Sequence, residues 1–159
     1  MNRPVFLGVL TASLAMVAAS FPLQAADPAP WPWTSKLPPD PALVQLVSVD
    51  DVSVVINKSE PPTVAITVNA QAPTPNFTEL QLTPRMGDPK DLVFSFDAKG
   101  RPPQDMTIQV VKPVSFTVEY SGAPIDKIGV VEVNALENCK AFSVTDNKAV
   151  ECTSQSTPQ

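Results

Sequence analysis

Apolar and polar residues alternate with a period of two over most of the chain from Leu43 onward. Side chains of a β-strand point alternately to opposite faces of a sheet, so each alternating run predicts a strand with one buried face. We expect strands in the runs 63–71, 79–83, 92–96, 106–110 and 114–120. No window shows a sustained apolar helical period, and the 19 prolines disfavour long helices.

Two further β-branched segments break the alternation. The region 43–57 is divided by Asp50-Asp51, which predicts either a hairpin or one long strand with a bulge. In the run 127–135 the phase changes at Val130-Val131, so a bulge or a strand buried on both faces is expected. Many short strands separated by regular turn signals predict an all-β fold, an antiparallel immunoglobulin-like β-sandwich. Because no pair of cysteines flanks a central tryptophan, this prediction depends on strand number and pattern alone.

The N-terminal residues have the order of a secretory signal peptide. Arg3 precedes an uncharged, mostly apolar run over 5–23, and small residues follow, which predicts cleavage near Ala25. An uncleaved membrane anchor is the alternative, but serines and a proline interrupt the run. We therefore expect a periplasmic or secreted protein with no membrane span in the mature chain.

The chain is expected to contain one folded domain between less regular segments. The expected divisions are a signal peptide at 1–25, a proline-rich extended arm at 26–42, a single β-sandwich domain at 43–153 and a flexible tail at 154–159. Six prolines predict an extended, polyproline-like conformation for the arm. The arm also holds Trp31 and Trp33. Either one ring packs on the domain edge and tethers the arm, or the arm is a recognition element.

The two cysteines of the chain, Cys139 and Cys152, are predicted to form a disulfide in an exported protein. Their spacing is far from that of a redox-active CxxC pair, so a structural bond that closes a terminal hairpin is favoured. If the cysteines oppose each other, Ala141 faces Val150 and Phe142 faces Ala149. The best turn residues, Asp146-Asn147, would instead place the cysteines diagonally. A bulge or a wider loop is expected to resolve this conflict.

The composition excludes several kinds of chemistry. The chain has no histidine and a formal net charge of −5. Histidine-based catalysis and metal binding are thereby excluded, and nucleic acid is a poor partner for the acidic surface. We expect no cofactor, no metal site and no enzymatic activity, with a carboxylate-based enzyme as the least favoured alternative.

Four residues are candidate partner contacts: Trp31, Trp33, Phe77 and Arg101. Phe77 follows the loop 73–76 and is either a core aromatic at a strand start or an exposed contact, with the core favoured. Arg101 lies in the basic turn 99–103, which is either a solvated hairpin end or a receptor-contact or inhibitory loop.

A loose resemblance to a group of small exported bacterial β-sandwich proteins covers about residues 52–135. It is carried by the segments KSEPPTVAITVNAQAPTPNFTELQLTPR, LVFSFDA, TIQVVKPVSFTVEY and IGVVEVNA. The resemblance implies export and a β-sandwich, and it transfers no active-site residue.

The expected function is that of an exported, non-enzymatic binding or structural module of the bacterial envelope. Its partner would be a protein or glycan of the envelope, bound through loops or an edge strand. The alternative is an inhibitor of an envelope or host hydrolase that acts through a proline-rich loop, either 73–77 or 100–103.

Overall fold

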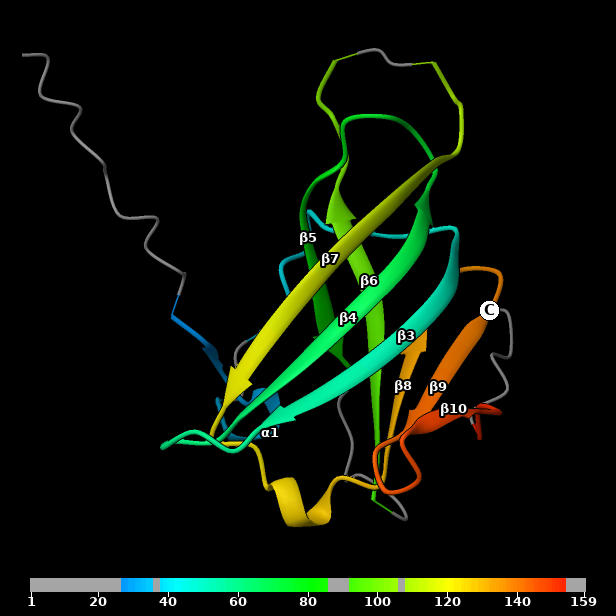
Figure 1. Cartoon of the computed structure of the whole chain (residues 1–159). Coiled ribbons are helices and arrows are strands. Elements are labelled where there is room, and N and C mark those ends of the chain that lie inside the picture. Colours follow the sequence, from blue (N-terminus) through cyan, green and yellow to red (C-terminus); the bar gives the residue numbers. More distant parts are fainter. Residues whose placement is uncertain (1–26, 36–37, 86–91, 106–107, 154–159) are drawn as a thin grey trace, which may run out of the picture.

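Two β-sheets face each other in the protein (Figure 1). Buried apolar side chains form the core between them. The computed structural model describes residues 27–35, 38–85, 92–105 and 108–153. The predicted signal peptide and the predicted tail at 154–159 lie outside these residues. Within the described part, no helix has the length and apolarity needed to cross a membrane.

Strands dominate the described chain. The first sheet has the order β1-β7-β4-β3, and the second has the order β10-β9-β8-β6-β2, with β5 also paired to β6. The elements are β1 (Ala29–Pro30), α1 (Pro32–Ser35), β2 (Val44–Gln45), β3 (Ser48–Asn57), β4 (Thr63–Ala72), β5 (Thr78–Pro84), β6 (Val93–Arg101), β7 (Lys112–Ser121), the 3₁₀ turn η1 (Ile125–Lys127), β8 (Val130–Asn134), β9 (Cys139–Ser143) and β10 (Lys148–Val150).

The core follows directly from the alternation in the sequence. Val64, Ile66 and Val68 of β4 are fully buried between the sheets, while Thr67 and its alternating neighbours are more exposed. Phe96 is the largest fully buried residue that the second sheet contributes. The predicted strands at 63–71, 79–83, 92–96 and 114–120 are confirmed by β4, β5, β6 and β7.

The prediction of a purely antiparallel fold is wrong. Strands β6 and β8 pair in parallel, with Val93 opposite Val130 and Asp97 opposite Asn134. After β6 the chain crosses to the other sheet, and β7 carries it back to the end where β6 began. β8 therefore starts at that end and runs in the same direction as β6. A second, shorter parallel pair joins Ala29–Pro30 to β7.

The proline-rich segment is not the extended arm that its composition predicts. It forms β1 and the single turn α1, and the side chain of Trp31 between them is 1% exposed. The indole ring lies edge-on to Phe94 and Tyr120, with centroid distances of 5.1 and 5.5 Å. Because burial of a large aromatic ring outweighs the polyproline preference of its neighbours, the segment belongs to the folded unit.

The second of the two predicted alternatives for the region 43–57, one long strand with a bulge, holds for β3 (Ser48–Asn57) but not for the start of the region, where Val44–Gln45 form the separate strand β2 of the other sheet. The bulge lies at Asp50, between the pairs formed by Val49 and Asp51. Just before the bulge, at Leu46 and Val47, the chain passes from the second sheet to the first. Leu46 donates its N–H to the carbonyl of Ala98 in one sheet, and Val47 donates to that of Gln71 in the other, each at 2.9 Å.

Strand β8 is buried on both faces, as its irregular pattern allows. Val131 and Val133 face the core, while Glu132 and Asn134 point to the opposite face, and all four are 0% exposed. No register shift interrupts its pairing with β6 or β9.

The predicted strand at 106–110 is wrong in its described part. Residues 108–110 are in no strand, and Ile108 is 77% exposed. Alternation alone does not make a strand, because the backbone also needs a neighbour with which to pair.

Asn138, in the turn between β8 and β9, joins the second sheet to the edge of β3. Its side-chain amide accepts from the N–H of Val49 at 2.7 Å and donates to the carbonyl of Val49 at 2.8 Å. The amide thus takes the place of a neighbouring peptide unit.

Replacing Asn138 with alanine is expected to destabilise the protein by about 2 kcal/mol, because two half-buried backbone groups lose their partners. Chemical denaturation measures this change. Asn57→Ala, which removes a long, exposed hydrogen bond to Thr63, is the control and should change stability by less than about 0.5 kcal/mol. Equal losses for the two variants would contradict the role assigned to Asn138.

Candidate functional site

A groove of about 260 Å³ opens along one side of the molecule, between the edges of β5 and β7. Its walls are mainly apolar and come from both sheets and from the proline-rich segment. Its lining residues are Ala29, Pro30, Pro32, Pro38, Pro39, Asp40, Leu43, Gln81, Leu82, Thr83, Pro84, Val118 and Tyr120.

The edge of β7 that borders this groove has backbone groups that no described strand covers. Trp31 donates its N–H to the carbonyl of Ser121 at 2.9 Å, so the polar groups of Ser121 face β1 and not β4. In an antiparallel pairing this direction alternates along the strand. The N–H and C=O groups of Ser115, Thr117 and Glu119 therefore point to the same side. β1 covers the end of this side, because the pairing of Ala29 with Tyr120, whose own groups face β4, places the Ala29 N–H at the Glu119 carbonyl. The groups of Ser115 and Thr117 and the N–H of Glu119 are left uncovered by any described strand.

Each of the two strands that border the groove, β7 and β5, has a proline whose missing N–H lies on the side that faces away from its paired strand. Pro113 lies two residues before Ser115, so its missing N–H is on the free side of β7 and costs no bond to β4. On β5, Arg85 donates to the carbonyl of Ser95 on β6, so Pro84 faces away from β6. Prolines at these positions mark two sheet edges that no strand among the described residues covers.

Tyr120 bridges the floor of the groove. Its hydroxyl donates to the carbonyl of Leu82 on β5 at 3.4 Å, which joins the two edges at one end. Burial raises the pKa of Tyr120, so its hydroxyl keeps the proton that it donates at neutral pH. The groove is therefore closed at Tyr120, and the uncovered edge of β7 continues from Val118 at the groove toward Ser115.

Arg101 fixes the proline-rich segment at the rim of the groove. Its guanidinium bridges Asp40 and Glu79 at 2.8 and 2.7 Å. The hydrogen bond to Glu79, followed by that to Asp40, raises the pKa of Arg101. The pKa of Asp40 is lowered, first by the N–H of Ala42 and also by Arg101. Arg101 is thus engaged within the chain, and as an exposed pair it adds little stability.

Phe77 packs against the core at the start of β5, which agrees with the favoured of its two predicted roles. A Cβ placed on Gly100 would lie 2.9 Å from both the Phe77 ring and Leu80. Glycine at this position therefore allows the Phe77 ring to approach β6 closely.

The four candidate contacts do not form one surface. Phe77 and Arg101 lie where β5 begins and β6 ends, since Thr78 pairs with Arg101. The two indoles lie toward the other end of β6, where Trp33 packs on Phe94 with centroids 4.9 Å apart. The structure places Trp31 in the core, and Trp33 is half-buried beside it.

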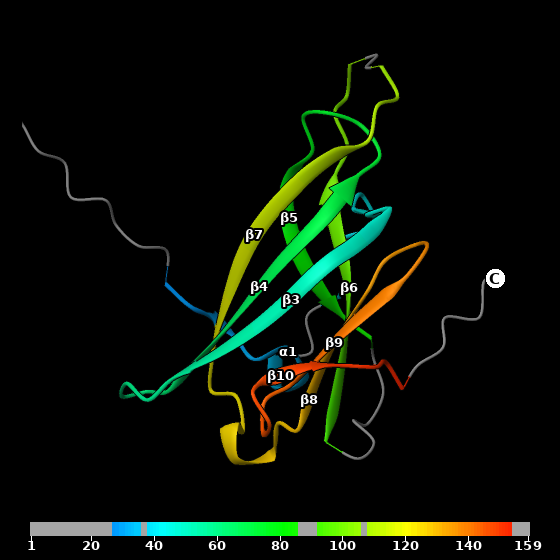
Figure 2. The same ribbon diagram turned by 45° about the vertical axis from the view of Figure 1, so that its right-hand side comes forward.

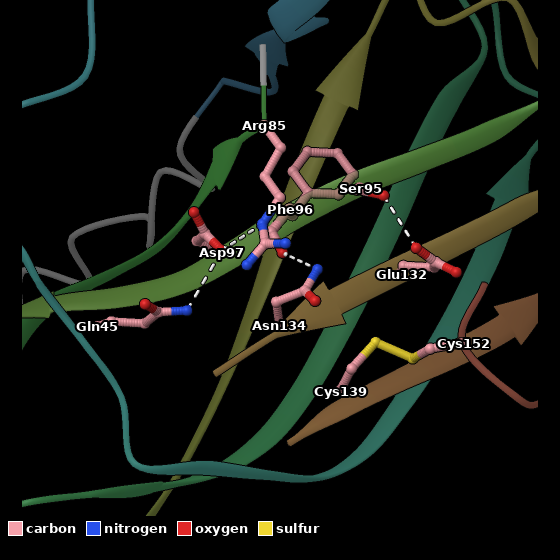
Figure 3. A network of polar contacts seen from close by, with 9 residues as sticks. All are labelled: Gln45, Arg85, Ser95, Phe96, Asp97, Glu132, Asn134, Cys139 and Cys152. Atoms are coloured by element: carbon pink, nitrogen blue, oxygen red, sulfur yellow. Dashed lines mark hydrogen bonds and ion pairs between the residues drawn. A yellow bond between two sulfur atoms is a disulfide. The ribbon is translucent and has the colours of Figure 1, made fainter. Parts of the chain in front are cut away.

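A buried polar network on the far face of the second sheet has no counterpart in the sequence predictions (Figure 3). The Ser95 hydroxyl donates to the Glu132 carboxylate at 3.0 Å, and Thr153 donates to it through its N–H and its hydroxyl. Nearby, Asn134 donates to the carbonyl of Phe96 at 3.1 Å. A single acidic residue within the apolar run VVEVNA was the available signal for this network.

The disulfide between Cys139 and Cys152 is confirmed, with a Cα–Cα distance of 6.3 Å. Ala141 pairs with Val150 and Phe142 with Ala149, which is the register with opposed cysteines. The expected wider loop resolves the turn conflict, because residues 144–147 separate the strands and Asn147 has φ 52°. The disulfide fixes Cys152, and this keeps the adjacent Thr153 close to Glu132.

None of the known protein families, curated proteins or solved structures compared with the chain matches it.

Proposed function

We propose that the protein is an exported, non-enzymatic binding module of the bacterial envelope that takes up an extended polypeptide segment on the free edge of β7. The single observation that carries this proposal is the row of outward backbone groups at Ser115, Thr117 and the N–H of Glu119, on the strand whose Val118 and Tyr120 line an apolar groove. An added strand gains main-chain hydrogen bonds, and pockets for alternate side chains give specificity.

The side chains of β7 support the same mode of binding. Val114, Phe116 and Val118 point toward the facing sheet but are only partly buried. A guest strand next to β7 would direct every second side chain to the same face as these residues, where its apolar groups would cover them and would reach the groove at Val118. The two facing sheets fit the immunoglobulin-like β-sandwich that we propose as the fold class, and the disulfide favours an oxidising compartment.

The inhibitor alternative receives less support. It requires the loop at Gly100–Pro103 to present Arg101 to a hydrolase, but Arg101 is bound to Asp40 and Glu79. Phe77, in the other proline-rich loop, is packed on the core.

The test is selection of peptides from a displayed library of random extended sequences. We expect the selected peptides to alternate apolar and polar residues. Ser115→Pro should weaken their binding at least about tenfold, because the free-edge N–H is lost and the proline ring obstructs the edge. Ser115→Ala keeps the backbone group and is the matched control.

Thermal unfolding of both variants establishes that they remain folded. Glu119→Pro is a second, independent variant, which removes an outward N–H four residues further along the same edge. Peptides without alternation, or peptides that bind Ser115→Pro as well as they bind Ser115→Ala, would remove the basis of the proposal.

A further inference from the structure

A second cavity, of about 310 Å³, lies near α1 and η1 at the opposite end of the molecule from Arg101. Its walls are almost entirely carbon, and no carboxylate occurs among its described lining residues. These are Trp31, Trp33, Thr34, Leu92, Phe94, Gly122, Pro124 and Lys127.

The aromatic wall is held rigidly by the fold. The Trp33 ring packs on Trp31 and Phe94, with centroid distances of 5.4 and 4.9 Å. Thr34 donates to the carbonyl of Trp31 through both its N–H and its hydroxyl, at 3.0 and 2.7 Å. The single turn α1 therefore keeps the half-buried indole of Trp33 in place without a ligand.

Leu92 is kept at the cavity by an unusual backbone conformation. It is 50% exposed and has φ 63°, a region that bulky residues seldom adopt. Its carbonyl accepts from the N–H groups of Gly129 and Val130, at 3.0 and 3.2 Å, which fixes this conformation. At Gly122, another lining residue, an added Cβ would meet nothing within 4 Å, so this part of the wall borders open space.

The cavity has one charged lining residue, and it is positive. Lys127 is exposed and forms no ion pair with any residue that the structure describes. Its stem can lie along the apolar wall while the ammonium group reaches the opening. The neighbouring Asp126 is not part of the lining.

We propose that this cavity binds a small amphipathic carboxylate, with its apolar body against the two indoles and its anionic head at Lys127. The volume is about twice that of a cavity that accommodates benzene, and it lies within the usual range of ligand pockets. Apolar walls without fixed polar partners do not suit a sugar, whose hydroxyls would lose their hydrogen bonds.

Intrinsic fluorescence provides a direct test, because both tryptophans of the chain line the cavity. The probes are decanoate, decanol and decyltrimethylammonium, which share one alkyl chain, each kept below its micelle-forming concentration. We expect a saturable change with decanoate, a weaker one with decanol and the weakest with the cation. No saturable change with decanoate, or equal affinities for all three, would overturn the proposal.

A pair of lysine variants then locates the anion. Lys127→Gln should reduce decanoate affinity about three- to fivefold, to the level of decanol, without changing decanol binding. Lys112→Gln, at the exposed start of β7 and outside the lining, should change neither. Equal effects of the two variants would show a general charge effect and contradict the proposed site. Peptide binding at β7 does not depend on either outcome.

Discussion

Replacement of Trp31 by alanine is expected to lower the free energy of unfolding by about 3–5 kcal/mol, the usual cost of removing a large buried aromatic side chain. The ring is 1% exposed and contacts Phe94, Phe96 and Tyr120, so its loss leaves a cavity between the two sheets. Urea denaturation followed by circular dichroism measures the change.

Trp33→Ala is the matched control for Trp31, because its ring is only half-buried and packs beside the first. Its expected cost is smaller, about 1–2 kcal/mol. If the two variants lose the same stability, or if Trp31→Ala loses less than about 1 kcal/mol, the proline-rich segment is not part of the core in solution.

Removal of the disulfide by the double replacement Cys139→Ser and Cys152→Ser is expected to cost about 3 kcal/mol on the chain-entropy model. The consequence extends beyond the hairpin. Thr153 follows Cys152 directly and donates two hydrogen bonds to the fully buried Glu132. Without the bond, these donors are less firmly held at the carboxylate.

A double-mutant cycle measures this coupling. Glu132→Gln should cost more in the disulfide-bonded protein than in the serine variant, with an interaction energy of about 1 kcal/mol. Glu151→Gln, an exposed carboxylate next to Cys152, is expected to be additive with disulfide loss. Unchanged stability after reduction would contradict the structural role of the bond and would make the hairpin a candidate for function.

Much of the fold could be predicted because burial imposes a period of two on strands that face a core. β4 and β7 occupy almost the positions that alternation assigns to them, since both pack one face on the second sheet. The same rule fails at Ile108, where the pattern is present but no described strand pairs with it. The alternation of apolar residues indicates which face of a strand could be buried. Whether the segment forms a strand also depends on a pairing partner from another part of the chain.

The candidate groove could not be predicted for the same reason. An open edge is a property of the finished sheet, because it depends on which strand lacks a second neighbour. Pro113 and Pro84 were the local signals for it, and each was also consistent with a turn. For Trp31, the predicted alternative of a ring packed on the domain agrees with the structure, but the ring lies in the core and not at the domain edge, which the proline-rich context did not indicate.

The three partners of β6 have a consequence for the order in which the chain can assemble. β6 pairs with β2 and β5, which precede it, and with β8, which follows only after β7 has been added to the other sheet. The second sheet is therefore incomplete until β10, which ends at Val150, is available, and the ring of Trp31 has no Phe94 to contact before β6 exists. Cys152 comes last of all. Both ends of the described chain therefore pack on strands from its centre, with β1 on β7 and the β9–β10 hairpin on β8 (Figure 2).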